Sequence, residues 1–226
     1  MIARVVLALG FSLLFSRGMA LVALADVAGN LTIAVTGAEG PDLSATPIAW
    51  DGIGVLVHLS NFTKEITKQQ VADIFSGKIT LLSELGGLET KILVIDRPRN
   101  PSIRDAFESQ LGITGKITGA AKVIGSDEQV VKTVVGALPH LSAVTCLSLG
   151  QGLAVVSGGV AVSLLLIGKV EPEGPTVKDG RYPLRRPALL LSKKEPHPLA
   201  EVFTQFVLSQ AGQQLIAETY IPINGK

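Results

Sequence analysis

Residues 96–108 read Asp-Arg-Pro-Arg-Asn-Pro-Ser-Ile-Arg-Asp-Ala-Phe-Glu, and they follow the apolar run Ile92 to Ile95. The apolar run predicts a buried strand, and the two prolines predict a turn after it. Ser102 is then placed to cap a helix. Apolar residues recur along that helix at positions i, i+4 and i+8, namely Ile103, Phe107 and Leu111. The stretch therefore predicts a strand, a turn and a helix in direct succession.

The turn in this stretch carries groups that bind anions. A helix N-terminus offers unpaired backbone N–H groups and the positive end of the helix dipole. Arg97 and Arg99 add guanidinium groups, whose planar array of donors suits an oxyanion. Most strand–turn–helix junctions with a serine cap bind nothing, so a purely structural turn is the alternative interpretation.

The rest of the chain alternates strands with helices, which predicts an α/β fold with a mainly parallel or mixed sheet. Strands are predicted at 31–36, 46–58, 91–95, 122–124, 142–149 and 188–191, and further helices at 66–75, 126–135, 198–208 and 211–218. The apolar segment 149–170 contains no polar residue suited to chemistry, and we expect it to form core sheet.

Particular residues set the predicted boundaries. Thr67 and Ser126 are placed as N-caps, and Gly77 is placed to end the helix that Thr67 begins. Gly52 and Gly54 lie inside the long strand, where glycine indicates a bend, a bulge or a close approach of another part of the chain.

The amino-acid composition argues against a nucleic-acid-binding protein, a protein with an intramolecular disulfide and a metalloprotein. The 226 residues include 20 Lys and Arg against 19 Asp and Glu, and only 4% are aromatic. Neither feature is typical of a nucleic-acid-binding protein. The lone cysteine, Cys146, has no intramolecular disulfide partner, and its apolar setting predicts a buried thiol. The three histidines show no metal-ligand spacing, so we expect no metal and no cofactor.

The first 25 residues predict a secretory signal peptide. Arg4 supplies the positive start, residues 5–15 form the apolar segment, and Ala23-Leu24-Ala25 is a small-x-small cleavage site. We therefore expect a periplasmic or secreted protein. An uncleaved N-terminal membrane anchor is the alternative, although Arg17 and Gly18 interrupt the hydrophobic stretch.

Five colinear blocks between about Thr46 and Ile223 resemble the periplasmic phosphate-binding protein family of ABC transporters. The blocks are 46–53, 74–80 followed by 84–87, 180–187, 206–213 and 220–223. The segment 180–187, Gly-Arg-Tyr-Pro-Leu-Arg-Arg-Pro, is similar to the family's "GKYPLSRP" segment. The resemblance implies a type 2 periplasmic-binding-protein-like α/β fold with mixed sheets.

The resemblance also implies a set of ligand-binding residues. The family's phosphate loop reads Gly-Ser-Gly-Thr-Arg before Phe-Glu, with an arginine just upstream. The residues that the resemblance places around an oxyanion are Arg97, Asn100, Ser102 and Arg104. Residues 100–103, Asn-Pro-Ser-Ile, replace the family's Gly-Ser-Gly-Thr, which removes two hydroxyls, and Pro101 also lacks a backbone N–H.

The first lobe is shorter than in the family, whose members carry two strand–helix units before the long strand. After the signal peptide we expect one phosphate-binding-protein-like domain, residues 26–226. Its parts are a remnant of the first lobe with the crossing strand at 26–60, a second lobe at 61–170, and a return segment with the C-terminal helices at 171–226.

Two functions follow from these observations. The first is a solute-binding protein that takes a small oxyanion such as phosphate and passes it to the membrane components of an ABC transporter, or to a sensor. The second is a non-catalytic binding or assembly module that kept the fold, lost phosphate, and engages another protein or a second copy of itself through an exposed sheet edge. Neither function requires an enzyme.

Overall fold

The computed structural model describes residues 20–25, 31–36, 43–61, 63–98, 103–137, 142–196 and 198–223. The chain forms two compact units. The first comprises Met1–Asp51 with Pro187–Lys226, and the second comprises Gly52–Arg186. The sequence divides residues 26–226 into parts with boundaries at positions 60 and 170, and this division into lobes stays a prediction.

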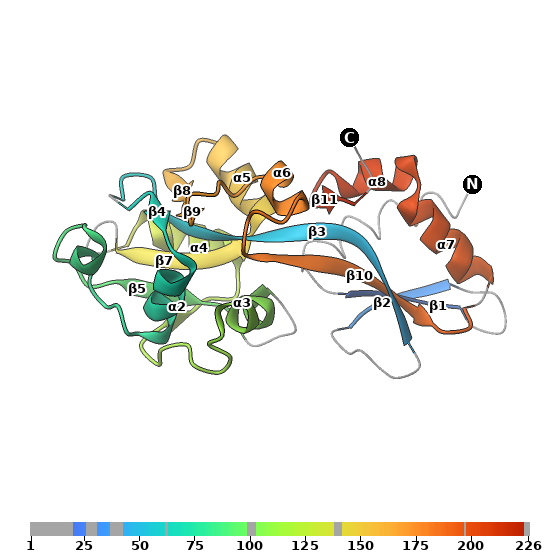
Figure 1. The fold of residues 1–226 in the computed structure, drawn as a ribbon, viewed down its shortest axis with the longest axis horizontal. Coiled ribbons are helices and arrows are strands. Elements are labelled where there is room, and N and C mark those ends of the chain that lie inside the picture. The colour runs from blue at the N-terminus through green and yellow to red at the C-terminus, as the bar shows by residue number, and fades with distance from the viewer. Residues whose placement is uncertain are drawn as a thin grey trace. The chain divides into compact units, whose positions relative to one another are not determined.

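The second unit contains a mixed sheet in the order β3-β7-β5-β6, and β8 also pairs with β3 (Figure 1). Its strands are β3 (Leu43–His58, shared with the first unit), β5 (Leu93–Asp96), β6 (Lys122–Val123), β7 (Ala143–Ser148) and β8 (Val162–Leu164). Strand β7 is antiparallel to β3 and parallel to β5, and β5 is parallel to β6. A short parallel pair, β4 (Glu65–Ile66) with β9 (Leu166–Ile167), lies outside this sheet. These pairings confirm the predicted mixed α/β architecture.

Within the described residues, the second unit contains three helices that the sequence predicts and three that it does not. They are α2 (Lys68–Ser76), the 3-10 helix η1 (Leu82–Leu85), α3 (Ile103–Leu111), α4 (Asp127–Val135), α5 (Leu149–Ser157) and α6 (Gly174–Lys178). Thr67 caps α2, and Gly77 ends it in the left-handed conformation at φ 81°. Ser126 caps α4 by accepting a hydrogen bond from the backbone N–H of Gln129. The cap predictions for Thr67, Gly77 and Ser126 are confirmed.

Segment 149–157 corrects the expectation of continuous core sheet from 149 to 170. It forms helix α5, and only Val162–Leu164 and Leu166–Ile167 are strands. Leu149 and Gly152 are the buried residues of α5, and their i, i+3 spacing is that of one helix face. A short apolar run fits a buried strand and a buried helix equally well by hydrophobicity, so only the packing partner separates the two.

The close approach predicted for the glycines of β3 explains how α5 packs. A Cβ atom on Gly52 would lie 2.8 Å from Leu149 Cδ2 and 2.9 Å from Val177 Cγ2. A Cβ atom on Gly54 would lie 2.6 Å from Leu164 Cδ2. Glycine is therefore present on β3 because neighbouring side chains occupy the space that a larger residue would need.

The first unit combines strands from both ends of the chain. Its elements are β1 (Ala20–Ala25), β2 (Leu31–Thr36), the start of β3, β10 (Arg185–Lys193, which begins in the second unit), α7 (Pro198–Leu208), α8 (Gln210–Ile216) and β11 (Ile221–Pro222). Strand β1 pairs antiparallel with β2 and parallel with β10, and β11 pairs antiparallel with β3. The predicted signal peptide ends within β1, at Ala25, and its cleavage stays a prediction.

The core of the first unit is a cluster of apolar side chains, and a buried glutamine bonds to the backbone of two of its members. Its buried residues are Ile48, Ala49, Leu190, Phe203, Val207, Ile216 and Tyr220. The Gln213 amide is also buried and donates to the carbonyls of Ile48 and Val207, each at 3.0 Å, while accepting from the Ile223 N–H at 2.9 Å. These bonds tie α8 to β3 and to the segment that follows β11. Across the described ranges, no helix combines the length and apolar character needed to cross a membrane.

We expect Gly52→Ala to lower the free energy of unfolding by about 1–3 kcal/mol, because the added methyl group overlaps Leu149 and Val177. Gly119→Ala is the matched control, since a Cβ atom there meets nothing within 4 Å. Urea unfolding of both variants measures the difference. Equal midpoints for the two variants would show that α5 does not pack against β3 in this way.

Candidate anion site at the carboxyl ends of parallel strands

Three parallel strands of the second unit end beside the segments that begin three helices. Strand β5 ends at Asp96, β6 at Val123 and β7 at Ser148. Helices α3, α4 and α5 follow these strands in the chain, and α5 starts at the residue directly after β7. In open α/β sheets, ligands bind outside the carboxyl ends of the strands, where helix N-termini present unpaired N–H groups. Asp96 and the start of α3 lie at this edge of the sheet.

A buried ion-pair cluster joins the end of β5 to α3. Arg104 lies in the first turn of α3, and its Nη2 is 2.9 Å from Asp96 Oδ2. Its Nε is 2.9 Å from Glu108 Oε1, one helical turn further along. Asp96, Arg104 and Glu108 are each less than 10% exposed. The second oxygen of Glu108 accepts a hydrogen bond from the Gly115 N–H at 2.6 Å.

This cluster changes the helix face that the sequence predicts. Phe107 is fully buried as expected, and its ring meets Phe75 edge to face with centroids 4.7 Å apart. Ile103 and Leu111, however, are only partly buried, while Arg104 and Glu108 are buried. The three apolar positions of the predicted helix are therefore not equally buried. Ion pairing permits two charged residues to take places in the buried face.

Arg97, the residue directly after β5, makes a second set of contacts. Its backbone N–H donates to Asp96 Oδ1 at 2.7 Å. Its Nη2 donates to the Gly125 carbonyl at 3.2 Å and to Asp127 Oδ1. Its Nη1 is buried and has no hydrogen-bond partner among the residues that the structure describes. One guanidinium nitrogen of Arg97 therefore retains donor capacity for a ligand.

Asp127 and Gln151 also take part in this second set of contacts, and they lie in helices α4 and α5. Asp127 is the first residue of α4, and its Oδ2 accepts a hydrogen bond from Gln151 Nε2, in α5, at 2.7 Å. Neither residue was predicted from the sequence to belong to the site. Asp127 looked like an ordinary acid at a helix start, where the dipole favours negative charge. Gln151 lay inside a segment expected to be apolar sheet.

The charges of the two sets nearly cancel. Among the described side chains of these two sets, two arginines face three carboxylates, from Asp96, Glu108 and Asp127. These side chains therefore provide no excess of positive charge that would attract any anion unselectively, and Arg99 lies outside the described residues. Binding there has to rest on directed hydrogen bonds, chiefly the remaining donor capacity of Arg97.

The structure brings two of the predicted ligand residues together. Arg97 and Arg104 both contact Asp96, one through its backbone and the other through its guanidinium. Asn100 and Ser102 lie outside the described residues, as does the prediction that Ser102 caps α3. The roles of all four residues as ligands stay predictions. No cluster of His, Cys, Asp or Glu in the described ranges has the grouping of a metal site.

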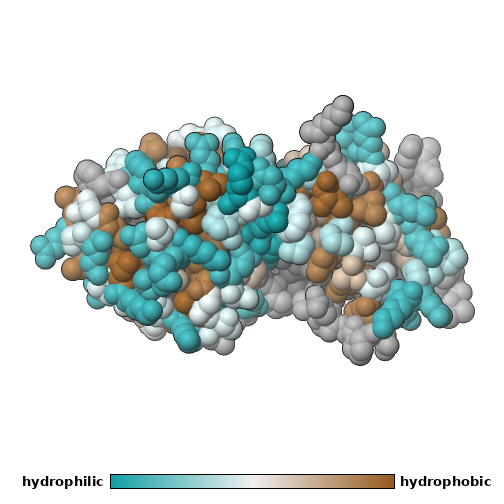
Figure 2. Space-filling model, viewed as in Figure 1, coloured by the Kyte–Doolittle hydropathy of each residue, from teal (hydrophilic) through white to brown (hydrophobic). Residues whose placement is uncertain are grey.

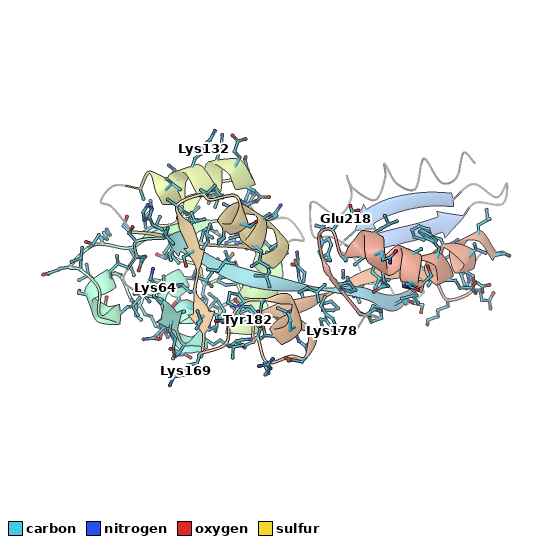
Figure 3. All side chains as sticks on the ribbon, turned by 90° about the horizontal axis from the view of Figure 1, so that it is seen from above. Lys64, Lys132, Lys169, Lys178, Tyr182 and Glu218 are labelled. Atoms are coloured by element: carbon cyan, nitrogen blue, oxygen red, sulfur yellow. The ribbon has the colours of Figure 1, made fainter. Side chains whose placement is uncertain are left out.

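Residues 181–186 include two arginines, Arg181 and Arg185, whose guanidinium groups bond to other groups of the second unit. Arg181 pairs with Asp179 at 2.8 Å, and its hydrogen bond lowers the pKa of that exposed carboxyl. Arg185 Nη1 donates to the carbonyls of Val177 at 2.8 Å and Lys178 at 3.1 Å, at the end of α6. Between them, Tyr182 points into the unit (Figure 3), where its hydroxyl donates to the Ile53 carbonyl at 2.9 Å. Arg181 is therefore paired with an acidic residue two positions away in the same segment.

Comparison with known proteins gives the same family from sequence and from structure. A family model described as a PBP superfamily domain matches residues 15–211. The phosphate-binding protein PstS of Bacillus subtilis (strain 168) is 28% identical over 200 residues, which cover 86% of this chain and 64% of that protein. The phosphate-binding protein PstS 2 of Streptococcus pneumoniae serotype 4 is 31% identical over 134 residues, covering 56% of this chain and 43% of that protein. The chain thus matches less than two thirds of either relative's length.

Two solved structures are similar over most of the chain. A putative phosphate ABC transporter substrate-binding protein from Clostridium perfringens, with bound phosphate, is 29% identical with a TM-score of 0.69, covering 80% of this chain and 72% of that one. An ABC-type phosphate transport receptor from Vibrio cholerae is 24% identical with a TM-score of 0.71, covering 94% of this chain and 84% of that one. The second likeness is evidence for the fold alone.

We expect Glu108→Gln to lower the free energy of unfolding by about 3 kcal/mol, because it removes a buried carboxylate that pairs with Arg104. Glu128→Gln makes the same chemical change in the exposed pair with Lys132, which lies on the outer side of α4 (Figure 3). That control should change stability little, since solvent screens exposed pairs. Denaturant unfolding of both variants separates the two cases, and equal small losses would contradict a buried cluster.

Cys146 should be unreactive in the folded protein. Burial, with a smaller contribution from the negative charge of Asp96, raises the pKa of the Cys146 thiol to about 12. The nucleophilic thiolate is therefore scarce at pH 8. Iodoacetamide labelling followed by mass spectrometry should show modification only in concentrated guanidinium chloride. Equal labelling rates in native buffer and in denaturant would show that the thiol is accessible.

Proposed function

The chain belongs to the PBP superfamily, and from this premise we propose that it is a solute-binding protein that takes a small oxyanion of the phosphate class. The fold prediction, a type 2 periplasmic-binding-protein-like fold with mixed sheets, is confirmed by the family match and the solved structures. Phosphate as the ligand is supported by the names of the curated relatives and by the phosphate bound in the Clostridium perfringens structure.

The observation that carries this proposal is the buried Nη1 of Arg97, which has no partner within the described ranges. A buried donor without an acceptor costs about 1–3 kcal/mol, and more when the group is charged. An oxyanion oxygen placed against Nη1 removes that cost and makes a charge-assisted hydrogen bond. The same oxygen would lie at the carboxyl ends of the parallel strands, where α/β folds bind their ligands.

We assign different roles to the other predicted ligand residues. Asn100 and Ser102 follow Arg97 in the chain, and they would add an amide and a hydroxyl to the ligand shell. Arg104 is already paired with Asp96 and Glu108, so its main role is to hold α3 against the end of β5. The proposal involves binding and release, with no bond made or broken.

The proposed setting is the exterior of the cytoplasmic membrane. A cleaved signal peptide at residues 1–25 would export the chain to the periplasm, and its removal would take β1 out of the sheet and leave β2 and β10 without that partner. There it would pass its anion to the membrane components of an ABC transporter, the class of system to which the Clostridium perfringens relative is ascribed by its name.

The second candidate function is that of a binding or assembly module, which has the same fold but does not bind phosphate. Among the described side chains of the site, carboxylates outnumber arginines. Pro101 also lacks a backbone N–H, and both features oppose tight anion binding. Among the described strands, β2 ends the sheet order. An unpaired edge is a template for strand pairing, so the occupant in this case would be a second copy of the chain or a protein partner.

We expect phosphate to bind the wild-type protein, and Arg97→Ala to weaken that binding by about 10- to 100-fold, the loss expected for one charge-assisted hydrogen bond. Arg181→Ala is the matched control, since it removes an arginine whose ion pair with Asp179 is exposed. Isothermal titration with phosphate and then sulfate measures all three proteins.

Unchanged phosphate affinity in Arg97→Ala would remove Arg97 from the site. If neither anion produces heat with a protein shown to be folded, the solute-binding proposal fails. Sedimentation over a range of concentrations would then test the assembly function, which requires a dimer or larger species.

A further inference from the structure

The position of Gln151 is fixed by the packing of the first turn of α5. Leu149 is 1% exposed and lies against β3 where Gly52 leaves room for it. Gly152 is buried, and a Cβ atom there would lie 3.0 Å from Leu164 Cδ2. Residue 151 lies between these two buried positions, so its backbone is held on both sides. The direction in which the side chain of residue 151 leaves the backbone is therefore fixed.

Gln151 directs its amide at a carboxylate that also contacts Arg97. Gln151 Nε2 donates to Asp127 Oδ2 at 2.7 Å, and Arg97 Nη2 pairs with the other oxygen, Oδ1. The Asp127 side chain is 39% exposed, whereas that of Arg97 is 13% exposed. An aspartate this exposed is free to turn toward water unless a second bond restrains it. Gln151 provides that bond.

We propose that Gln151 is a positioning residue of the anion site, which acts through Asp127 to hold the Arg97 guanidinium with Nη1 facing the ligand. The inference rests on the proposed function for its ligand, and on the hydrogen bonds among α4, α5 and the end of β5 for its geometry. It assigns a binding role to α5, a segment whose sequence offers no sign of one.

The chemistry of the glutamine amide suits this role. A neutral N–H donor satisfies Asp127 Oδ2 without competing with Arg97 for charge. A leucine at position 151 would fill similar space and remove the donor. A glutamate would match the shape of glutamine but bring a second negative charge against Asp127, and like charges at such a separation repel strongly. The two replacements therefore separate packing from electrostatics.

The test compares Gln151→Leu and Gln151→Glu with the control Gln69→Leu. Gln69 also donates its amide to an aspartate, Asp73 Oδ1 at 3.0 Å, but it does so on the exposed surface of α2. In titrations with inorganic phosphate, we expect about tenfold weaker binding for Gln151→Leu, the usual scale for losing a bond that orients a liganding group. We expect a larger loss for Gln151→Glu and no change for Gln69→Leu.

A second measurement needs no ligand. In ¹⁵N NMR spectra, the Arg97 guanidinium of the wild-type protein should show slow rotation and slow hydrogen exchange, because Asp127 and Gly125 hold it. Both Gln151 variants should lose this protection, whereas Gln69→Leu should keep it.

These outcomes separate the two proposals. If the wild-type protein binds no phosphate, the proposed function fails, and the NMR comparison alone decides the role of Gln151. If wild type and Gln151→Leu bind phosphate equally, or if Arg97 keeps its protection in Gln151→Leu, the positioning role is overturned while phosphate binding stands. A greater loss for Gln151→Leu than for Gln151→Glu would also overturn it, since packing would then explain the effect.

Discussion

The buried contact between Asp96 and Arg104 organises the second unit around the end of β5. Neither charge is stable away from water without the other, because desolvation of an unpaired ion costs several kcal/mol. The pair therefore fixes α3 against the end of β5. The same carboxylate also accepts the backbone N–H of Arg97, which sets the direction in which the chain leaves the strand. Arg97 consequently reaches toward Gly125 and Asp127.

This arrangement gives a different electrostatic picture from the one that two clustered arginines suggest. Each guanidinium meets carboxylates, and the chain as a whole carries a formal charge of only +1. Affinity for an anion therefore has to come from the geometry of a few donors and not from a long-range field. Figure 2 shows hydrophilic and hydrophobic residues interspersed over the coloured part of the face that it draws.

Local signals predicted the elements well where short-range chemistry decides them. Thr67, Gly77 and Ser126 form caps through bonds to residues three or four positions away, so the sequence contains both partners of each bond. The prediction failed where the deciding partner is distant. Segment 149–157 is a helix whose first residue, Leu149, packs beside Gly52, almost a hundred residues earlier, and no local pattern encodes that contact.

Hydrophobic period, turn residues and colinear motifs are local properties, so they were enough to predict the α/β class and the family. The construction of the site, by contrast, depends on tertiary contacts. In the folded chain, Arg104 pairs with Asp96 and Glu108. Arg97 contacts Asp127, and Gln151, from an apolar segment, donates to the same Asp127 carboxylate. Charge pairing depends on which groups meet at the edge of a sheet, and parallel strands bring together residues that lie far apart in the chain.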